Sequence, residues 1–183
     1  MGMGRVNTIA FHPTNSYCFY AGASSGGIWK TTNYGATWTD ISNNLPMLSV
    51  SAIAINPMNP DIIYAGTGDR DYPGTGMGVY KSTNGGVLWE ACNNTMGEVT
   101  VSEIIIHPTI PEIMMAATGG GIFKTINSGT SWELASTDII AYRNIKFKPG
   151  DPTIIYATKG DGTFLRSVDT GTSFSQVFIP VSG

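Results

Sequence analysis

The sequence predicts an all-β fold, a β-propeller of four four-stranded antiparallel blades. Three observations lead to this prediction. One turn motif recurs four times along the 183 residues, similar short apolar runs flank every copy, and no segment shows the periodicity of an amphipathic helix. Four short strands in each repeat, with a period of roughly 40–50 residues, are typical of propeller blades.

The recurring motif has the pattern Ser/Thr-x-Asn/Asp-x-Gly-x-x-Trp/Phe, and its copies span residues 31–38, 82–89, 125–132 and 167–174. The interval between the first two copies is roughly eight residues longer than the other two intervals. Four matches at nearly even spacing indicate repeated structural units. The extra length marks a departure within the second repeat.

The motif contains the residue types needed for a tight turn between the third and fourth strands of a blade. The Asn or Asp side chain can accept hydrogen bonds from backbone N–H groups that follow it, and Gly supplies a positive φ. The aromatic ring can anchor the last strand by packing. A carboxylate with a catalytic role would not be replaced by an amide in three of the four copies, so a structural role is predicted. The positions are Asn33, Gly35, Trp38, Asn84, Gly86, Trp89, Asn127, Gly129, Trp132, Asp169, Gly171 and Phe174.

The flanking segments supply the other strands. Each repeat starts with an apolar run that stops at a Pro, as in residues 9–13 and 53–57, and two further apolar runs follow, separated by turns rich in Gly, Asn and Pro. The expected blades are therefore about residues 5–45, 48–95, 99–137 and 140–179.

The four motifs resemble the Asp-box, or bacterial neuraminidase repeat, of sialidases, sortilin-type receptors and xyloglucan-cleaving glycosidases. The resemblance covers nearly the whole chain. It implies that these turns are structural and lie on the face opposite the ligand site. It also implies an extracellular or cell-surface protein, although the N-terminus has no signal-peptide pattern.

Composition argues against several classes of partner. Ten Lys and Arg residues are spread thinly against 13 Asp and Glu, for a net charge of -3, so no nucleic-acid partner is expected. No apolar stretch approaches the roughly 18 residues of a membrane span, so no membrane insertion is expected. Repeat alignment assigns Cys18 and Cys92 to the core and His12 and His107 to turns. We therefore expect no disulfide, metal site or cofactor.

The longer second repeat suggests where a ligand binds. Its extra residues, 68–76, connect the second and third strands, and strand alternation places this loop opposite the motif turns. Loops from the other repeats and the connectors between repeats emerge on the same face, including Ser24, Ser25 and Lys159. A polysaccharide or protein ligand and an ordinary solvated loop remain alternatives. The candidate ligand-face residues are Asp69, Arg70, Asp71, Tyr72, Tyr142, Arg143 and Asp161.

No catalytic residue is assigned. Glycosidases generally need two carboxyl groups about 5–9.5 Å apart, and residues two apart on one loop, such as Asp69 and Asp71, rarely face one substrate. The Arg-Ile-Pro segment of sialidases is absent, because Phe178 precedes Ile179. Ser25 also stands before a Gly-Gly pair where the resemblance to xyloglucan-cleaving enzymes implies an acid.

The favoured function is therefore a non-catalytic binding or scaffold module of a larger secreted or surface protein, with polysaccharide or protein as its ligand. The alternative is a fragment of a glycoside hydrolase, xyloglucanase-like or sialidase-like, with part of the catalytic set in other blades. A third possibility is an assembly factor or receptor-like propeller that binds a protein.

The order of strands leaves closure of the propeller open. The first repeat begins with an inner strand and the last ends with an outer strand, so both end blades should expose an apolar face. A compact ring of four blades, a homodimer with eight blades and a segment of a propeller of about six to eight blades are alternatives. The last is favoured, with residues 179–183 beginning the next connector.

Overall fold

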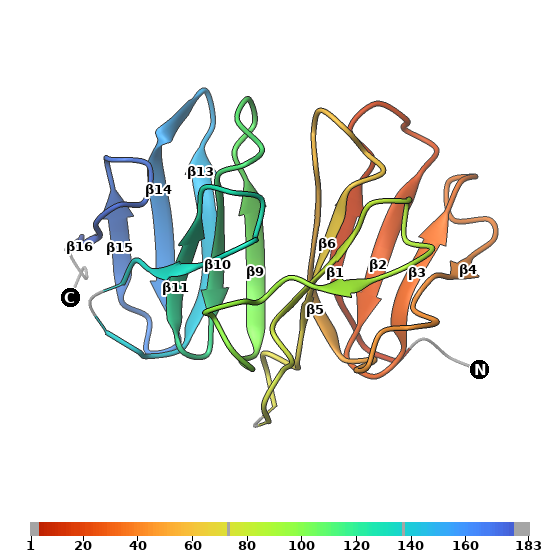
Figure 1. Ribbon diagram of the computed structural model, residues 1–183, viewed down its shortest axis with the longest axis horizontal. Helices are drawn as coiled ribbons and strands as arrows, with labels where there is room; N and C mark the ends of the chain where they lie inside the picture. The colour runs from red at the N-terminus through yellow and green to blue at the C-terminus, as the bar shows by residue number, and fades with distance from the viewer. Residues whose placement is uncertain (1–3, 73, 137, 178–183) are drawn as a thin grey trace, which may run out of the picture.

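A computed structural model describes residues 4–72, 74–136 and 138–177. Within these residues the chain forms sixteen strands and no helix (Figure 1). We number the blades in chain order. Blade 1 contains β1 (Val6–Phe11), β2 (Phe19–Ala23), β3 (Gly27–Thr31) and β4 (Thr39–Asp40); blade 2 contains β5 (Val50–Ile55), β6 (Ile63–Thr67), β7 (Val79–Ser82) and β8 (Glu90–Ala91); blade 3 contains β9 (Val101–Ile106), β10 (Met114–Thr118), β11 (Gly121–Thr125) and β12 (Glu133–Leu134); blade 4 contains β13 (Tyr142–Lys148), β14 (Asp151–Lys159), β15 (Phe164–Ser167) and β16 (Ser175–Gln176).

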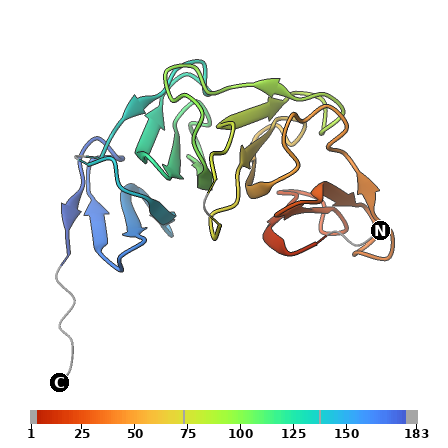
Figure 2. The ribbon, with the colours of Figure 1, turned by 90° about the horizontal axis from the view of Figure 1, so that it is seen from below.

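Each blade is a separate antiparallel sheet whose strands pair in sequence order. The first strands of the blades are neighbours in space: β5 contacts β1 and β9, and β9 contacts β13. Figure 2 shows the four sheets following one another along an arc, with blade 1 and blade 4 at its two ends. This arrangement confirms the predicted all-β architecture of four four-stranded antiparallel propeller blades.

The hydrophobic core lies between the blades. Tyr20 and Trp89 belong to the cluster between blades 1 and 2, Tyr64 and Trp132 to that between blades 2 and 3, and Met115 to that between blades 3 and 4. Strands β6 and β10 are buried along their whole length because both faces of their sheets are covered. Stacking successive blades therefore buries the apolar surface that drives folding.

The aromatic residue of the motif joins each blade to the preceding one. The indole Nε1 of Trp89 donates a hydrogen bond of 2.7 Å to the carbonyl oxygen of Ile41, and Trp132 does the same to Cys92 at 2.8 Å. Both indole rings are buried. A buried polar group needs a hydrogen-bond partner, and this bond provides one for the indole N–H. The bond also fixes the position in which each ring packs.

The motif turns share one hydrogen-bond pattern. In blade 3, the Oδ1 atom of Asn127 accepts from the backbone N of Ser131 at 3.0 Å and from the hydroxyl of Thr125 at 2.8 Å. The Thr125 hydroxyl also accepts from the backbone N of Gly129 at 3.1 Å. Ser128 and Gly129 both have positive φ, of 58° and 84°. The first residue of the motif, Ser or Thr, is therefore the centre of the turn, which the sequence alone did not indicate.

The other positions judged by repeat alignment lie where expected. Cys18 and Cys92 are buried and free. The Nδ1 atom of His12 accepts from the backbone N of Asn15 at 3.1 Å, and that of His107 accepts from Ile110 at 3.1 Å. The described residues contain no helix long and apolar enough to cross a membrane.

Candidate functional site

The loop between β6 and β7, residues 68–78, lies at the end of the sheets opposite the motif turns (Figure 1). Its far side is held by blade 3: the backbone N of Gly76 donates to Thr100 Oγ1 at 3.1 Å, and that hydroxyl donates to the carbonyl oxygen of Gly74 at 2.9 Å. A Cβ on Gly76 would lie only 2.4 Å from the carbonyl oxygen of Thr67. Glycine is required there because the loop crosses directly over the backbone.

Blade 1 holds the near side of the loop through a charged pair. The Nη2 atom of Arg5 lies 2.5 Å and 2.7 Å from the two carboxylate oxygens of Asp69, and its Nε donates to Asn7 at 3.1 Å. The guanidinium carbon of Arg5 also lies 5.9 Å from the centre of the Tyr72 ring. Charge-assisted hydrogen bonds of this kind are strong and directional, so they fix the start of the loop.

Asp71 lies between two arginines that come from different blades. Its carboxylate is 3.5 Å from the Arg5 guanidinium and 3.7 Å from that of Arg143 in blade 4. Arg70 extends the other way and donates to the carbonyl oxygen of Asn7 at 3.3 Å. Alternating charges from blades 1, 2 and 4 therefore meet around one loop.

Arg70, Asp71 and Arg143 border a groove of about 360 Å³ that spans blades 2, 3 and 4. A second hollow of about 250 Å³ shares its Arg70, Asp71 and Arg143 walls. Tyr72 is 70% exposed, so its ring faces solvent. The lining residues of the groove are Asp69, Arg70, Asp71, Tyr72, Gly74, Thr100, Ser102, Gly119, Ala141 and Arg143.

Five of the seven predicted ligand-face residues meet in this groove: Asp69, Arg70, Asp71, Tyr72 and Arg143. The other two do not line it. Tyr142 is buried, with 1% exposure. Asp161 is exposed, but its Oδ1 accepts the backbone N of Thr163 at 2.8 Å within its own turn.

Tyr142 belongs to a polar cluster at the edge of the core. Its hydroxyl donates to Asp138 Oδ1 at 3.0 Å, and the Nζ atom of Lys159 donates to Asp138 Oδ2 at 2.6 Å. The hydrogen bond from Lys159 is the main cause that lowers the pKa of Asp138, and burial raises the pKa of Tyr142. These three groups hold the connector between blades 3 and 4 in place.

Sequence reasoning missed Arg5 and the contributions of blade 3, which are Thr100, Ser102 and Gly119. A signal was present for Gly119, because it occupies the turn between the second and third strands, the position of the insertion in blade 2. Thr100 directly precedes the first strand of its blade and so emerges on the same face. Arg5 precedes β1 in the same way.

The groove offers charged, polar and aromatic groups to a ligand. Both oxygens of Asp69 are bound by Arg5, and Asp71 is flanked by two cations. Hydroxyl, carboxylate and guanidinium groups beside an exposed aromatic ring can hydrogen-bond and stack with a polar ligand. Among the described residues no group of His, Cys, Asp or Glu could hold a metal ion.

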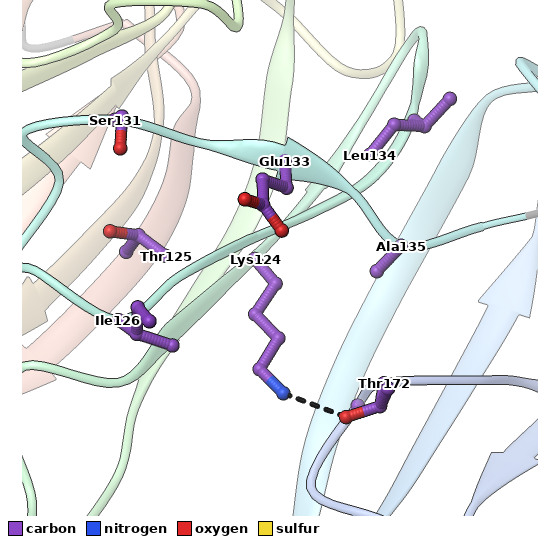
Figure 3. A pocket seen from close by; sticks show the side chains of 9 residues that line it. Lys124, Thr125, Ile126, Ser131, Glu133, Leu134, Ala135 and Thr172 are labelled. Carbon is purple, nitrogen blue, oxygen red and sulfur yellow. Dashed lines mark hydrogen bonds between the residues drawn. The ribbon is translucent and has the colours of Figure 1, made fainter.

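A separate pocket of about 270 Å³ lies on the side of the motif turns, between blades 3 and 4 (Figure 3). Lys124 crosses it to donate a hydrogen bond of 3.1 Å to the hydroxyl of Thr172, while Glu133 and Leu134 border its other side. Lys124 occupies the same strand position in its blade as Lys30, Lys81 and Arg166 do in theirs. This pocket is therefore part of the joint between two blades.

The chain was compared with known proteins by sequence and by fold. No family model matches the chain. It is 27% identical over 112 residues to the xyloglucanase Xgh74A of Acetivibrio thermocellus, an alignment that covers 49% of this chain and 13% of that enzyme.

Solved structures agree more extensively with the fold. An ancestral GH74 enzyme matches with a TM-score of 0.81 and 23% identity, over 97% of this chain and 24% of that one. The GH74 enzyme of Niastella koreensis matches with a TM-score of 0.75 and 19% identity, over 92% and 28%. YCF48 bound to D1 peptide matches with a TM-score of 0.67 and 13% identity, over 98% and 55%. The chain thus spans about a quarter of the GH74 structures it matches, and its four blades have the fold of their propellers.

Proposed function

We propose that these four blades are a polysaccharide-binding part of a xyloglucanase-like propeller, of the Asp-box type, from a secreted or cell-surface protein. In this proposal the groove around residues 68–76 binds the glycan, and the catalytic carboxyl pair is not supplied by this groove. The observation that carries the proposal is the groove's position, on the loop face of a propeller whose sequence is similar to part of a xyloglucanase.

The composition of the groove supports a glycan ligand. Sugars offer hydroxyl groups that pair with carboxylates, guanidinium groups and hydroxyls, and their apolar ring faces stack on aromatic side chains. Arg143 and Thr100 provide polar groups along the groove, and the exposed Tyr72 provides an aromatic face at its edge. The chain therefore offers both kinds of contact in one place.

The charge pairing supports binding without catalysis. The two carboxyl groups of a glycosidase must be free to face the scissile bond of the substrate. Asp69 instead forms two short bonds to Arg5, and Asp71 lies between Arg5 and Arg143. Both carboxylates are therefore already paired with arginines of blades 1 and 4.

Calorimetric titration with xyloglucan oligosaccharides tests this proposal, with cello-oligosaccharides for comparison. We expect Tyr72→Ala to weaken glycan binding at least about tenfold, because it removes the stacking face. Tyr17→Ala is the matched control, since Tyr17 is also exposed but lies in the β1–β2 turn, on the opposite side. Absence of binding by the unaltered chain would refute the proposal. Release of reducing sugar that Asp69→Asn abolishes would refute its non-catalytic part.

A second candidate ligand is a peptide with an acidic group. YCF48, which shares the fold, has been solved with a peptide bound. Two arginines, Arg70 and Arg143, line the groove and could pair with a peptide carboxylate. Titration with peptides that have free or amidated C-termini separates the two ligands: glycan binding without peptide binding favours the first proposal.

A further inference from the structure

Three of the chain's four arginines lie around the inserted loop, but their guanidinium groups are not used alike. Arg5 forms three side-chain hydrogen bonds, two to the carboxylate of Asp69 and one to the side chain of Asn7. Arg70 forms one, to the carbonyl oxygen of Asn7. Arg143 has only an ion pair of 3.7 Å, which is too long for a hydrogen bond. A guanidinium group has several N–H donors, so most donors of Arg70 and Arg143 have no partner among the described residues.

Both of these arginines are departures from the repeat. In every blade the pairing of the first strand with the second shifts register at one residue, and these equivalent residues are Asn7, Ser51, Ser102 and Arg143. Arg70 lies on the insertion, which only the second repeat contains. The other blades form the same four-stranded sheet without an arginine at either place, so the sheet itself does not require them. Two departures, in blades 2 and 4, therefore bring arginines to one groove.

The two arginines border two adjoining hollows. The groove of about 360 Å³ and the hollow of about 250 Å³ share Arg70, Asp71 and Arg143, and Asn144 completes the lining of the smaller one. The lining of the smaller hollow therefore consists of polar residues alone. Such a hollow suits a charged group with hydrogen-bond acceptors, because an apolar group would leave the guanidinium donors without partners.

Asp71 lies beside these arginines as an internal carboxylate. Its Oδ1 atom is 3.7 Å from Arg143 and its Oδ2 atom is 3.5 Å from Arg5. Both distances are longer than the 2.5 Å and 2.7 Å of the pair between Arg5 and Asp69, and the Asp71 side chain is 49% exposed. Exposed ion pairs contribute little free energy, so the carboxylate of a ligand can replace Asp71 beside Arg143 at small cost.

We propose that the groove selects a glycan that carries carboxylate groups, which is a chain containing uronic acid residues. A uronate carboxylate pairs with Arg70 and Arg143 and replaces Asp71 beside Arg143. This inference rests on the proposed function, since it names the class of glycan that the same groove binds. Pairing of guanidinium and carboxylate groups supplies direction as well as charge, so a neutral glycan binds less tightly. A glycan is favoured over an acidic peptide because the exposed Tyr72 ring offers a sugar a flat face in the same groove.

Calorimetric titration with two matched ligands tests the proposal. The first is a short oligogalacturonate, and the second is the same oligosaccharide after reduction of its carboxyl groups to alcohols. We expect the oligogalacturonate to bind at least about tenfold more tightly than the reduced form. Its affinity should fall between about 0.05 M and about 0.5 M salt, because salt screens exposed charges, while that of the reduced form should not change. Equal affinity for the two ligands would overturn the proposal.

Replacement of each arginine tests where the carboxylate binds. Arg70→Gln and Arg143→Gln should each weaken binding of the oligogalacturonate at least about tenfold and leave binding of the reduced form unchanged. Arg166→Gln is the matched control, because Arg166 is exposed but lines neither hollow, and it should leave both affinities unchanged. An equal loss of affinity for both ligands in the groove variants would contradict the proposal, since a displaced loop has that effect.

Asp71→Asn is expected to act in the opposite direction. Because Asp71 competes with the ligand for Arg143, its replacement should tighten oligogalacturonate binding about two- to fivefold, the range expected for an exposed ion pair. Asp161→Asn is the control: it removes the same charge from an exposed turn that lines neither hollow, and it should have no effect. Weaker binding by Asp71→Asn would refute the competition, and so would an equal gain in Asp161→Asn.

The same titrations distinguish failure of this inference from failure of the proposed function. Binding of neutral xyloglucan oligosaccharides without preference for oligogalacturonate would overturn this inference alone. Binding of oligogalacturonate without xyloglucan oligosaccharides would support it and replace the xyloglucan-like ligand with an acidic one. Binding of neither glycan would overturn both. A peptide that binds through its free C-terminal carboxylate as tightly as oligogalacturonate would overturn the glycan in favour of a peptide.

Discussion

The indole nitrogen of Trp132 lies 2.8 Å from the carbonyl oxygen of Cys92, across the joint between blades 3 and 2. Trp89 bonds in the same way to Ile41 across the joint between blades 2 and 1. Blades 2 and 3 are therefore each attached to the preceding blade by one side chain that both fills space and satisfies a backbone acceptor. The fourth copy of the motif has Phe174, which packs against the blade 3–4 core cluster but has no such donor.

Replacing Trp132 should separate these two contributions. Trp132→Phe keeps an aromatic ring but removes the donor, and we expect the free energy of unfolding to fall by about 1–2 kcal/mol. Trp132→Ala also leaves a cavity and should cost about 3–5 kcal/mol. Urea denaturation of both variants measures the difference. Equal stability of Trp132→Phe and the unaltered chain would show that the indole bond contributes nothing.

The hydroxyl at the start of the motif should matter more than other hydroxyls in the turn. Thr125→Val keeps the shape but removes a group that bonds Asn127 and the backbone N of Gly129. We expect a loss of about 1–3 kcal/mol, because buried polar partners are left unsatisfied. Thr130→Val is the control: the Thr130 hydroxyl is exposed and bonds only one carbonyl, so the loss should be about 0.5 kcal/mol or less. Thermal melts of the two variants provide the comparison.

Asp169 should make stability depend on pH. Hydrogen bonds from the hydroxyls of Ser173 and Ser167 lower the pKa of Asp169 far below its ordinary value. A carboxyl group whose pKa is lowered by folding stabilises the folded state above its unfolded pKa of about 3.9, and this contribution disappears as pH falls toward the folded pKa.

The matched variant is Asp169→Asn, since Asn127 makes equivalent bonds in blade 3. We expect the unaltered chain to lose stability below about pH 4 more steeply than this variant. Urea unfolding between about pH 6 and about pH 2 measures both slopes. Parallel curves would contradict the assignment.

Lys159 should control the ionisation of Asp138. Because its hydrogen bond is the main cause of the lowered pKa of Asp138, Lys159→Met should raise that pKa toward the ordinary value of an aspartate. Lys148→Met is the control, because Lys148 pairs with Asp151 instead. Carbon-13 NMR titration of the side-chain carboxyl groups follows Asp138 directly. An unchanged Asp138 pKa in Lys159→Met would show that other groups set it.

Two glycines of the inserted loop should respond differently to alanine. A Cβ on Gly76 would meet the carbonyl oxygens of Thr67 and Val99 at 2.4 Å and 2.5 Å, whereas nothing lies within 4 Å of a Cβ on Gly74. Gly76→Ala should therefore displace the loop, lower the melting temperature and weaken glycan binding at least about tenfold, and Gly74→Ala should leave the loop position and the melting temperature unchanged. Calorimetry and thermal melts test both variants. Equal behaviour would contradict the close approach at Gly76.

The sequence by itself determined the number of blades, the order of their strands and the chemistry of their turns. These features depend on local patterns: alternating apolar residues, Gly at positive φ, and an Asn or Asp that bonds its own turn. The sequence also identified the inserted loop, because the second repeat is longer than the other repeats. From strand alternation it predicted the face on which that loop emerges.

Only the tertiary structure decided which side chains meet on that face. Tyr142 and Arg143 are neighbours in β13, so their side chains point to opposite faces of the sheet: Arg143 lines the groove and Tyr142 is buried in the core cluster between blades 3 and 4. Which of the two faces is covered depends on how blade 4 packs on blade 3, and residue types do not reveal that packing. The contact of Arg5 with Asp69 likewise joins residues 64 positions apart. Both follow from how whole sheets stack, which no local pattern encodes.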